Sequence, residues 1–503
     1  MSSVTPSNLR SSQPPAALAV SQRVDEPGES SPPGGALLEE LALTLDHQQI
    51  GYCQWKGHWS AHRWRRGYGN VDLLVDRAAL PAFQLVAGQL GFKLAHPAGE
   101  RQIPGIEHYL GFDPSTPRLL HLHVHYRLLL GEYWKRVYRL PIERQILEQS
   151  RPGEPFRVPS PTHCFLIFVL RMMLRQIGRP LLSADDRWLS GIKVPLASLE
   201  AASDPEELAR LLTHHLYPID SPFINRCVRS LQGESGTLDR LVLPWELHLR
   251  LRAHVRRPTV SAMVTAGLEK VLPTAAAQRV VDPSLRLSAG GLVLALIEGQ
   301  GTSKSTCARA LHGWLAPDLP TMRAHLGHPP KSLLTLLVGV ALRLERGANQ
   351  LLRRTQRWGS HLEAFLHFCT ARDRYRLYQK VRRFGISGGI AVCEHYPMGG
   401  QTIDAEAVPP GASPAAPGWL ADQLRRAAAR YHNRILAPDA VFVLEVDPEL
   451  AVARKAEEPA DCARTPGWLR GPDSSTARGY LIDAAQPLPD LLRQLQTTLW
   501  PIL

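Results

Sequence analysis

The sequence predicts an α/β protein with a doubly wound parallel sheet toward the C-terminus, a separate α/β domain near the N-terminus and a helical segment between them. Three observations support this prediction. From residue 291 onward, strand-like apolar runs alternate with helical patterns, as in proteins built on a parallel sheet. Residues 35–150 begin with an amphipathic helical pattern that leads into a strand. Residues 151–280 contain mostly helical patterns.

The elements follow in order along the chain. Residues 1–34 are rich in Ser, Pro and Gly without periodicity, which predicts a disordered tail. The stretch LIFVLRMML (166–174) predicts a buried helix, because a membrane span needs about 20 apolar residues. VDPSLRLSAGG (281–291) combines Pro with Gly-Gly and predicts a linker. The strands predicted beyond it are LVLALIE (292–298), GIAVCE (389–394), AVFVLEV (440–446) and YLIDA (480–484).

The composition is that of a soluble globular protein, with 44% hydrophobic and 21% charged residues among 503. The net charge of +12 favours anionic partners such as nucleotides and phosphosugars. Nucleic-acid binding, which only that charge suggests, is not expected. The seven cysteines include no C-x-x-C pair, so we expect reduced core residues of a cytoplasmic protein rather than a disulfide or zinc framework.

The segment LVLALIEGQGTSKSTCARALHGWL (292–315) has the layout of a phosphate-binding P-loop. In such a loop, backbone N–H groups at a helix N-terminus hold phosphate oxygens, the lysine neutralises the outer phosphates and the next hydroxyl holds Mg²⁺. The pattern G-x-x-x-x-G-K-[ST] has glycine where this chain has Glu298 and Ser303, so the loop departs from it. The residues predicted to bind ATP are Gly299, Gly301, Thr302, Ser303, Lys304, Ser305 and Thr306.

Three later segments strengthen this interpretation: GGIAVCEHYP (388–397), PDAVFVLEVDPELAVARK (438–455) and GYLIDAAQPLPDLLRQL (479–495). In this order and spacing, and with the loop before them, they resemble the thymidylate kinase family of nucleoside monophosphate kinases over about residues 291–503. The resemblance implies a P-loop kinase fold with ATP and Mg²⁺ as cofactors. It also implies phosphoryl transfer to a small phosphorylated or sugar acceptor.

The resemblance also assigns roles to individual residues. The catalytic residues that it implies are Lys304, Glu394, Arg372, Arg454 and Arg464. Lys304 would bind the β- and γ-phosphates, and Ser305 and Glu394 would organise Mg²⁺. Arg372 would lie on the acceptor side, and the other two arginines would belong to a basic lid. His395 stands where the family has a phosphate-clamping arginine, which weakens the expectation of thymidylate kinase activity itself.

A second candidate site lies in YCQWKGHWSAHRWRRGYGNVDLLVDRAAL (52–80). This segment resembles the polymerase-beta-type nucleotidyltransferases over about residues 37–150. The resemblance places Lys56 and Gly57 at the triphosphate and Asp72 at the metal. Residues i and i+2 of a strand share one face, and Asn70 stands where the family's first metal-binding carboxylate would be.

A third acidic residue is expected where the strand RLLHLHVHYRLLLGE (118–132) has His123. Its neighbours His121 and His125 lie on the same strand face, which also suggests a transition-metal site. Side chains at i, i+2 and i+4 span about 13 Å, however, so all three could not bind one ion, and a structural strand is the alternative. Three hypotheses therefore stay open: a phosphotransferase, a catalytically impaired nucleotide sensor or scaffold, and a nucleotidyltransferase.

Overall fold

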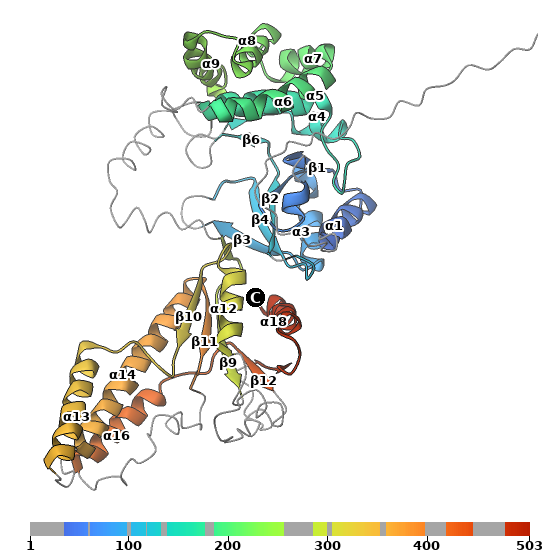
Figure 1. The fold of residues 1–503 in the computed structure, drawn as a ribbon. Helices are drawn as coiled ribbons and strands as arrows, with labels where there is room; N and C mark the ends of the chain where they lie inside the picture. The colour runs from blue at the N-terminus through green and yellow to red at the C-terminus, as the bar shows by residue number, and fades with distance from the viewer. Residues whose placement is uncertain are drawn as a thin grey trace, which may run out of the picture.

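The computed structural model of the chain describes eleven stretches: residues 35–58, 61–97, 102–116, 118–131, 138–176, 186–255, 285–298, 304–352, 359–397, 419–445 and 478–503. The predicted tail, residues 1–34, lies outside them. The described residues form a helical bundle at one end of the molecule, a mixed sheet in the middle and a parallel sheet with long helices at the other end (Figure 1).

The mixed sheet, here called the N-terminal sheet, contains six strands among the described residues, in the order β1-β2-β5-β4-β3-β8. Its strands are β1 Tyr52–Lys56, β2 Asn70–Val75, β3 Lys93–Pro97, β4 Ile106–Gly111, β5 Leu120–His125 and β8 Leu285–Leu287. Strands β2 and β5 are parallel, and the other neighbouring pairs are antiparallel. The accompanying helices are α1 Ala36–His47, α2 Ala61–Trp64, the 3₁₀-helix η2 Arg77–Ala79 and α3 Leu80–Gln89.

Helix α1 shows why this layer forms. Leu38, Leu41, Ala42 and Leu45 are buried, and their i, i+3, i+4, i+7 spacing places them on one face of a helix. That face packs into a core that also contains Leu73 of β2 and Leu122 of β5. The functional side chains discussed below lie on the opposite face of β2 and β5, because successive residues of a strand point to opposite sides.

The helical bundle surrounds α5, which is buried along most of its length. Its elements are β6 Leu129–Leu130, β7 Tyr138–Arg139, α4 Glu143–Glu148, α5 Pro161–Gln176, α6 Asp186–Ala202, α7 Pro205–His215, α8 Ser221–Gln232, α9 Thr237–Arg250 and η5 Arg252–His254. Helix α5 contacts α6, α7, α8 and α9, so the predicted buried helix is the centre of the bundle. Asp204 and Asp220 cap α7 and α8 by accepting backbone N–H bonds.

The C-terminal sheet contains five parallel strands among the described residues, in the order β10-β11-β9-β12-β13. Its strands are β9 Leu292–Glu298, β10 Thr321–His325, β11 Ile390–Glu394, β12 Ala440–Glu445 and β13 Arg478–Asp483. Its helices are α12 Lys304–Leu315, α13 Leu333–Leu352, α14 Gly359–Ile386, α16 Trp419–His432 and α18 Leu488–Ile502. The predicted parallel sheet is therefore present, and β10 is an edge strand that the sequence did not predict.

Helices cover both faces of the C-terminal sheet. Leu294 and Leu296 of β9 pack in one core with α12 and α18. Val293 and Ala295, which point the other way, pack with α14. A strand buried on both faces reads as a continuous apolar run, which is why β9 was predictable from its sequence.

The two sheets are joined through β8, which lies inside the segment predicted as a linker. Leu287 of β8 pairs with Ala95 of β3, so this segment completes the N-terminal sheet. The indole Nε1 of Trp500 in α18 donates a hydrogen bond of 2.9 Å to the carbonyl of Gly91. The N-terminal sheet and the C-terminal sheet therefore share packing contacts rather than being connected only by a flexible tether.

Two further properties bear on the sequence predictions. None of the helices that the structure describes is both long and apolar enough to cross a membrane. Six of the seven cysteines lie in the described stretches, and each of them is buried and free of disulfide bonds: Cys53, Cys164, Cys227, Cys307, Cys369 and Cys393.

Candidate functional site

The C-terminal site lies where the strand order of the sheet reverses. Strand β9 lies between β11 and β12, so the chain leaves it toward one edge of the sheet and later returns to build the other. In doubly wound sheets, ligands bind beyond the carboxyl ends of the strands at such a switch point. Strand β9 ends at Glu298, α12 begins at Lys304 and β11 ends at Glu394, so α12 and the end of β11 border this point.

Ser305 and Glu394 meet at this edge of the sheet. The Ser305 hydroxyl donates a hydrogen bond of 2.6 Å to Oε2 of Glu394, across 89 residues of sequence. Oε1 of the same carboxylate accepts a bond of 2.9 Å from the Arg323 guanidinium of β10. Burial would raise the pKa of Glu394, but the bonds from Ser305 and Arg323 outweigh it and hold the pKa below its usual value. Glu394 is therefore a buried, ionised carboxylate.

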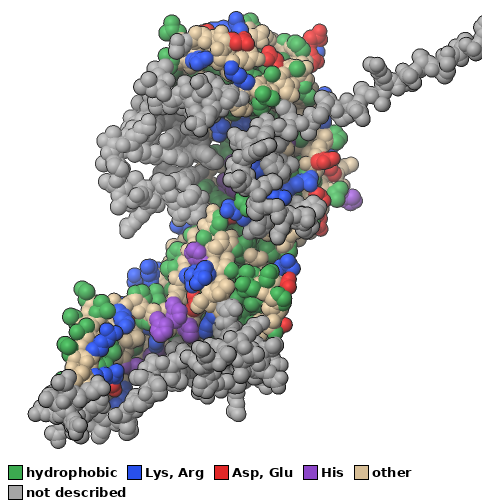
Figure 2. Space-filling model, viewed as in Figure 1, with side chains coloured by type: hydrophobic (Ala, Val, Ile, Leu, Met, Phe, Trp, Pro, Cys, Tyr) green, Lys and Arg blue, Asp and Glu red, His purple; other side chains and the backbone are tan. Residues whose placement is uncertain are grey.

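Histidines border the same carboxylate. His325 pairs with Glu394 in the register of β10 and β11, and its ring stacks on His395 at 4.6 Å and on His328 at 4.9 Å. Burial is the main cause that lowers the pKa of His325, and the charge of Lys304 lowers it further. Figure 2 shows histidine side chains, in purple, gathered on the surface of this part of the molecule.

Arg372, the predicted acceptor-side arginine, lies in α14. Its guanidinium binds Asp373 Oδ1 at 3.1 Å and the Ser332 hydroxyl at 2.6 Å. The neighbouring Arg374 donates a bond of 2.9 Å to the carbonyl of Leu326, in the loop after β10. These bonds tie α14 to the segment that connects β10 and α13.

Sequence reasoning missed Arg323 and His325, because β10 was not predicted as a strand and nothing else placed them beside Glu394. Of the predicted residues, Thr306 lies in the first turn of α12, after Lys304 and Ser305. The remaining predicted residues of the loop and lid lie outside the described residues: Gly299, Gly301, Thr302, Ser303, Arg454 and Arg464.

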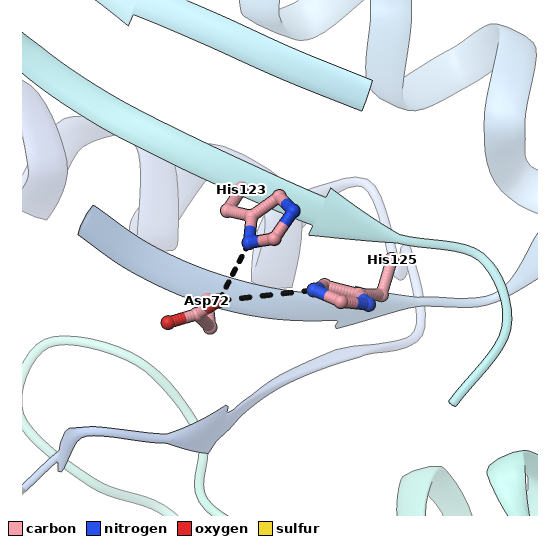
Figure 3. Close-up of side chains that lie close together, drawn as sticks. All are labelled: Asp72, His123 and His125. Carbon is pink, nitrogen blue, oxygen red and sulfur yellow. Dashed lines mark hydrogen bonds and ion pairs between the residues drawn. The ribbon is translucent and has the colours of Figure 1, made fainter. Parts of the chain in front are cut away.

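In the N-terminal sheet, Asp72 of β2 is the centre of a buried polar cluster (Figure 3). Its Oδ1 lies 2.8 Å from Lys56 Nζ of β1, 2.8 Å from His123 Nδ1 of β5 and 3.4 Å from Asn70 Nδ2. The register explains this meeting, because Lys56 and His123 are the cross-strand partners of Asp72 on its two sides. Burial would raise the pKa of Asp72, but the charge of Lys56 and the bond from His123 hold it well below its usual value.

Two more histidines of β5 have different surroundings. His125 Nε2 lies 3.7 Å from Asp72 Oδ1, which is too long for a hydrogen bond. His121 instead pairs with His108 of β4, at 3.0 Å between Nε2 and Nδ1. Gly57, predicted to contact a triphosphate, follows β1 with a φ of 76°, and its carbonyl accepts a bond of 3.2 Å from the Trp64 indole.

No protein-family model matches the sequence, and no curated protein matches it. One similar solved structure is that of thymidylate kinase from Candida albicans, at 17% sequence identity and a TM-score of 0.26. The match covers 42% of this chain and 91% of that chain.

Proposed function

We propose that the C-terminal sheet binds ATP with Mg²⁺ at the carboxyl ends of β9 and β11, and transfers a phosphoryl group to a small phosphorylated or sugar acceptor. The observation that carries this proposal is the 2.6 Å bond between Ser305 and Glu394. These are the residues that sequence reasoning assigned to Mg²⁺, and they come from elements far apart in the chain. Their meeting at the switch point of a parallel sheet supports a nucleotide site there.

The donor atoms at this point suit the expected ligands. A hydroxyl and a carboxylate offer the oxygen atoms that Mg²⁺ prefers, so Ser305 and Glu394 would hold the ion. Bound Mg²⁺ would neutralise charge on the β- and γ-phosphates. Lys304 begins α12, where the helix N-terminus favours phosphate, and its ammonium group would bind the same oxygens. Phosphoryl transfer depends mainly on such positioning and charge neutralisation.

Calorimetric titration of the full chain with ATP and Mg²⁺ tests this proposal. We expect Lys304→Ala to weaken binding at least about tenfold, which is about 1.4 kcal/mol. Lys193→Ala is a matched control, because Lys193 is an exposed lysine in α6 of the helical bundle. If wild type and Lys304→Ala bind ATP equally well, the proposal is wrong.

A specific feature of both sites favours a second candidate, a nucleotide-binding protein without turnover. In each sheet, the carboxylate expected to bind a metal is already paired with a cation of the chain. Arg323 lies 2.9 Å from Glu394, and Lys56 lies 2.8 Å from Asp72. A cation of the protein held there competes with a metal ion for the same oxygen atoms.

Turnover assays separate the two candidates. Nucleoside monophosphates and sugar phosphates would be incubated with labelled ATP and Mg²⁺, and product formation followed for wild type and Arg323→Ala. Phosphorylation by the wild type that depends on Lys304 supports the phosphotransferase. ATP binding without any product supports the non-catalytic protein, and product formed only by Arg323→Ala would identify Arg323 as the inhibitory cation.

A further inference from the structure

We propose that the N-terminal sheet holds one divalent transition-metal ion, such as Zn²⁺ or Fe²⁺, between Asp72, His123 and His125. One donor atom from each residue lies within 4.8 Å of the other two, and all three residues are buried. Figure 3 shows both histidine rings of β5 turned toward the carboxylate of β2. This inference concerns the N-terminal sheet alone and does not depend on nucleotide binding by the C-terminal sheet.

The distances from Asp72 to the two histidines are close to those of a coordination sphere. Zn²⁺ binds imidazole nitrogen and carboxylate oxygen at about 2.0–2.2 Å, so neighbouring ligand atoms of a tetrahedral site lie about 3.3 Å apart. Asp72 Oδ1 lies 2.8 Å from His123 Nδ1 and 3.7 Å from His125 Nε2. Each of these two distances needs to change by about 0.5 Å to match a tetrahedral site, and the donor atoms of His123 and His125 lie within 4.8 Å of each other.

His125 provides an independent observation that points to a ligand. Its side chain is 3% exposed, and neither ring nitrogen has a hydrogen-bond partner among the described residues. A buried polar group without a hydrogen bond is destabilising. The edge contact with Trp55, at 5.0 Å between ring centroids, holds the ring without satisfying its nitrogens. A metal ion between His125 and Asp72 would supply the missing interaction for Nε2.

The surroundings of His123 hold its ring in place. His108 stacks on the His123 ring at 4.6 Å with an interplanar angle of 17°, and His108 is in turn hydrogen-bonded to His121. Asn70 Nδ2 lies 3.4 Å from both His123 Nδ1 and Asp72 Oδ1. The stack with His108 orients the His123 ring before an ion arrives, whereas the Asn70 amide contacts the ligand atoms themselves and would have to move when the ion binds.

The donor types select the class of ion. Imidazole nitrogens suit Zn²⁺, Fe²⁺, Cu²⁺ and Ni²⁺, and two histidines with one carboxylate form a common set for such ions. Mg²⁺ prefers oxygen ligands in an octahedral arrangement, so this set disfavours it. Three protein ligands also leave a coordination position for water or a substrate.

Lys56 opposes metal binding, so replacing it provides a further test of the proposed site. Its ammonium group lies 2.8 Å from Asp72 Oδ1, the oxygen atom that the ion would bind. An ion must displace this group, and the two positive charges repel each other strongly at such distances. Removing the charge with Lys56→Met should strengthen metal binding at least about tenfold, a gain that misfolding cannot produce.

Metal-free full-length protein without an affinity tag would be titrated with Co²⁺ and Zn²⁺, followed by calorimetry and by the visible absorption of four-coordinate Co²⁺. We expect one ion per chain, and much weaker binding of Mg²⁺. Asp72→Asn and His125→Asn should each weaken binding at least about 100-fold, because each removes a direct ligand. His121→Gln, on the same strand face but bonded to His108, should retain binding.

Three results of the titrations would overturn the proposal. They are no stoichiometric binding of Co²⁺ or Zn²⁺ by the wild type, an equal loss in His121→Gln and His125→Asn, or no gain in Lys56→Met. X-ray absorption of the Co²⁺-loaded wild type should show nitrogen and oxygen neighbours including two imidazoles, and a spectrum with none would also refute the assignment.

Discussion

Replacing Arg323 with alanine is expected to destabilise the C-terminal sheet, because Glu394 would keep only one of its two charged or polar partners. Glu394 is 2% exposed, and Arg323 and Ser305 bind its two oxygen atoms. Breaking a buried ion pair costs about 3–5 kcal/mol. The Arg323 side chain is 34% exposed, and solvent screening reduces the expected loss to about 2 kcal/mol.

The loss should depend on pH in a defined direction. The pKa of Glu394 is lowered in the folded protein. Its contacts therefore contribute stability above the pKa of the unfolded chain, and that contribution disappears as the pH falls through the folded-state pKa. The difference between wild type and Arg323→Ala should be largest near neutral pH and should shrink in acid.

Hydrogen exchange of the β11 amide groups measures this loss, since it reports the opening of one part of a large chain. A loss of about 2 kcal/mol corresponds to exchange that is about 30-fold faster. Arg323→Ala should have much less effect when Glu394 is replaced by Gln, because the buried charge is then absent. Equal effects in both backgrounds would refute the ion-pair argument.

Three further predictions concern the packing around the sheets. Burial raises the pKa of Asp318 to about 6, so the folded chain binds a proton more tightly than the unfolded chain and stability falls as the pH rises through 6. Asp318→Asn should therefore stabilise by about 1 kcal/mol at pH 7.5 and by less at pH 4.5 in thermal melts, and a pH-independent change would contradict this. A Cβ at Gly291 would lie 2.2 Å from the carbonyl oxygen of Gly385. Gly291→Ala should therefore cost about 3 kcal/mol or more in urea unfolding, and a loss below about 1 kcal/mol would show that the backbone yields. Trp500→Phe removes the bond to Gly91 and should cost about 1 kcal/mol. Protease cleavage between the two sheets should then be faster than in wild type, and unchanged cleavage would show that this bond does not hold them together.

Much of the C-terminal sheet was predictable because its central strands are buried on both faces. Leu294 and Val293 of β9 face opposite cores, and such strands appear as continuous apolar runs. Strand β10 was missed because TMRAH carries Arg323 on an edge strand, and its sequence lacks that signal. The resemblance to the thymidylate kinase family implied that Ser305 and Glu394 share one site, and their meeting is consistent with parallel strands ending at one edge of the sheet. The presence of Arg323 depends on β10, which no sequence pattern indicated.

In the N-terminal sheet, the resemblance to the nucleotidyltransferases indicated Asp72 and His123 together, but not that His125 lies beside Asp72. The spacing of side chains along one strand argues against His121, His123 and His125 all binding one ion, because i, i+2 and i+4 span about 13 Å. That spacing takes no account of a ligand from the neighbouring strand, such as Asp72 of β2. Pairing of Asp72 with His123 is a property of the register between β2 and β5, which depends on the turn and packing geometry of the whole sheet. The approach of His125 to Asp72 therefore becomes visible only in three dimensions.

The two buried carboxylates are paired with different cations, and the difference would decide how each site accepts a metal ion. A buried carboxylate without a counter-charge is costly, so Glu394 is paired with Arg323 and Asp72 with Lys56. Arg323 is attached to an edge strand and is a third exposed, so it can turn into solvent when an ion arrives.

Lys56 has less freedom than Arg323. Its side chain is 23% exposed, and Arg171 of the helical bundle adds positive charge nearby. An ion at Asp72 must therefore be bound strongly enough to displace an enclosed ammonium group, and two imidazole nitrogens provide such binding where oxygen atoms alone would not. Removing Lys56 should accordingly increase Co²⁺ affinity by a larger factor than removing Arg323 increases Mg²⁺ affinity for the ATP-bound protein. Parallel titrations of the two variants measure both factors, and a larger gain for Arg323→Ala would contradict this account of the two cations.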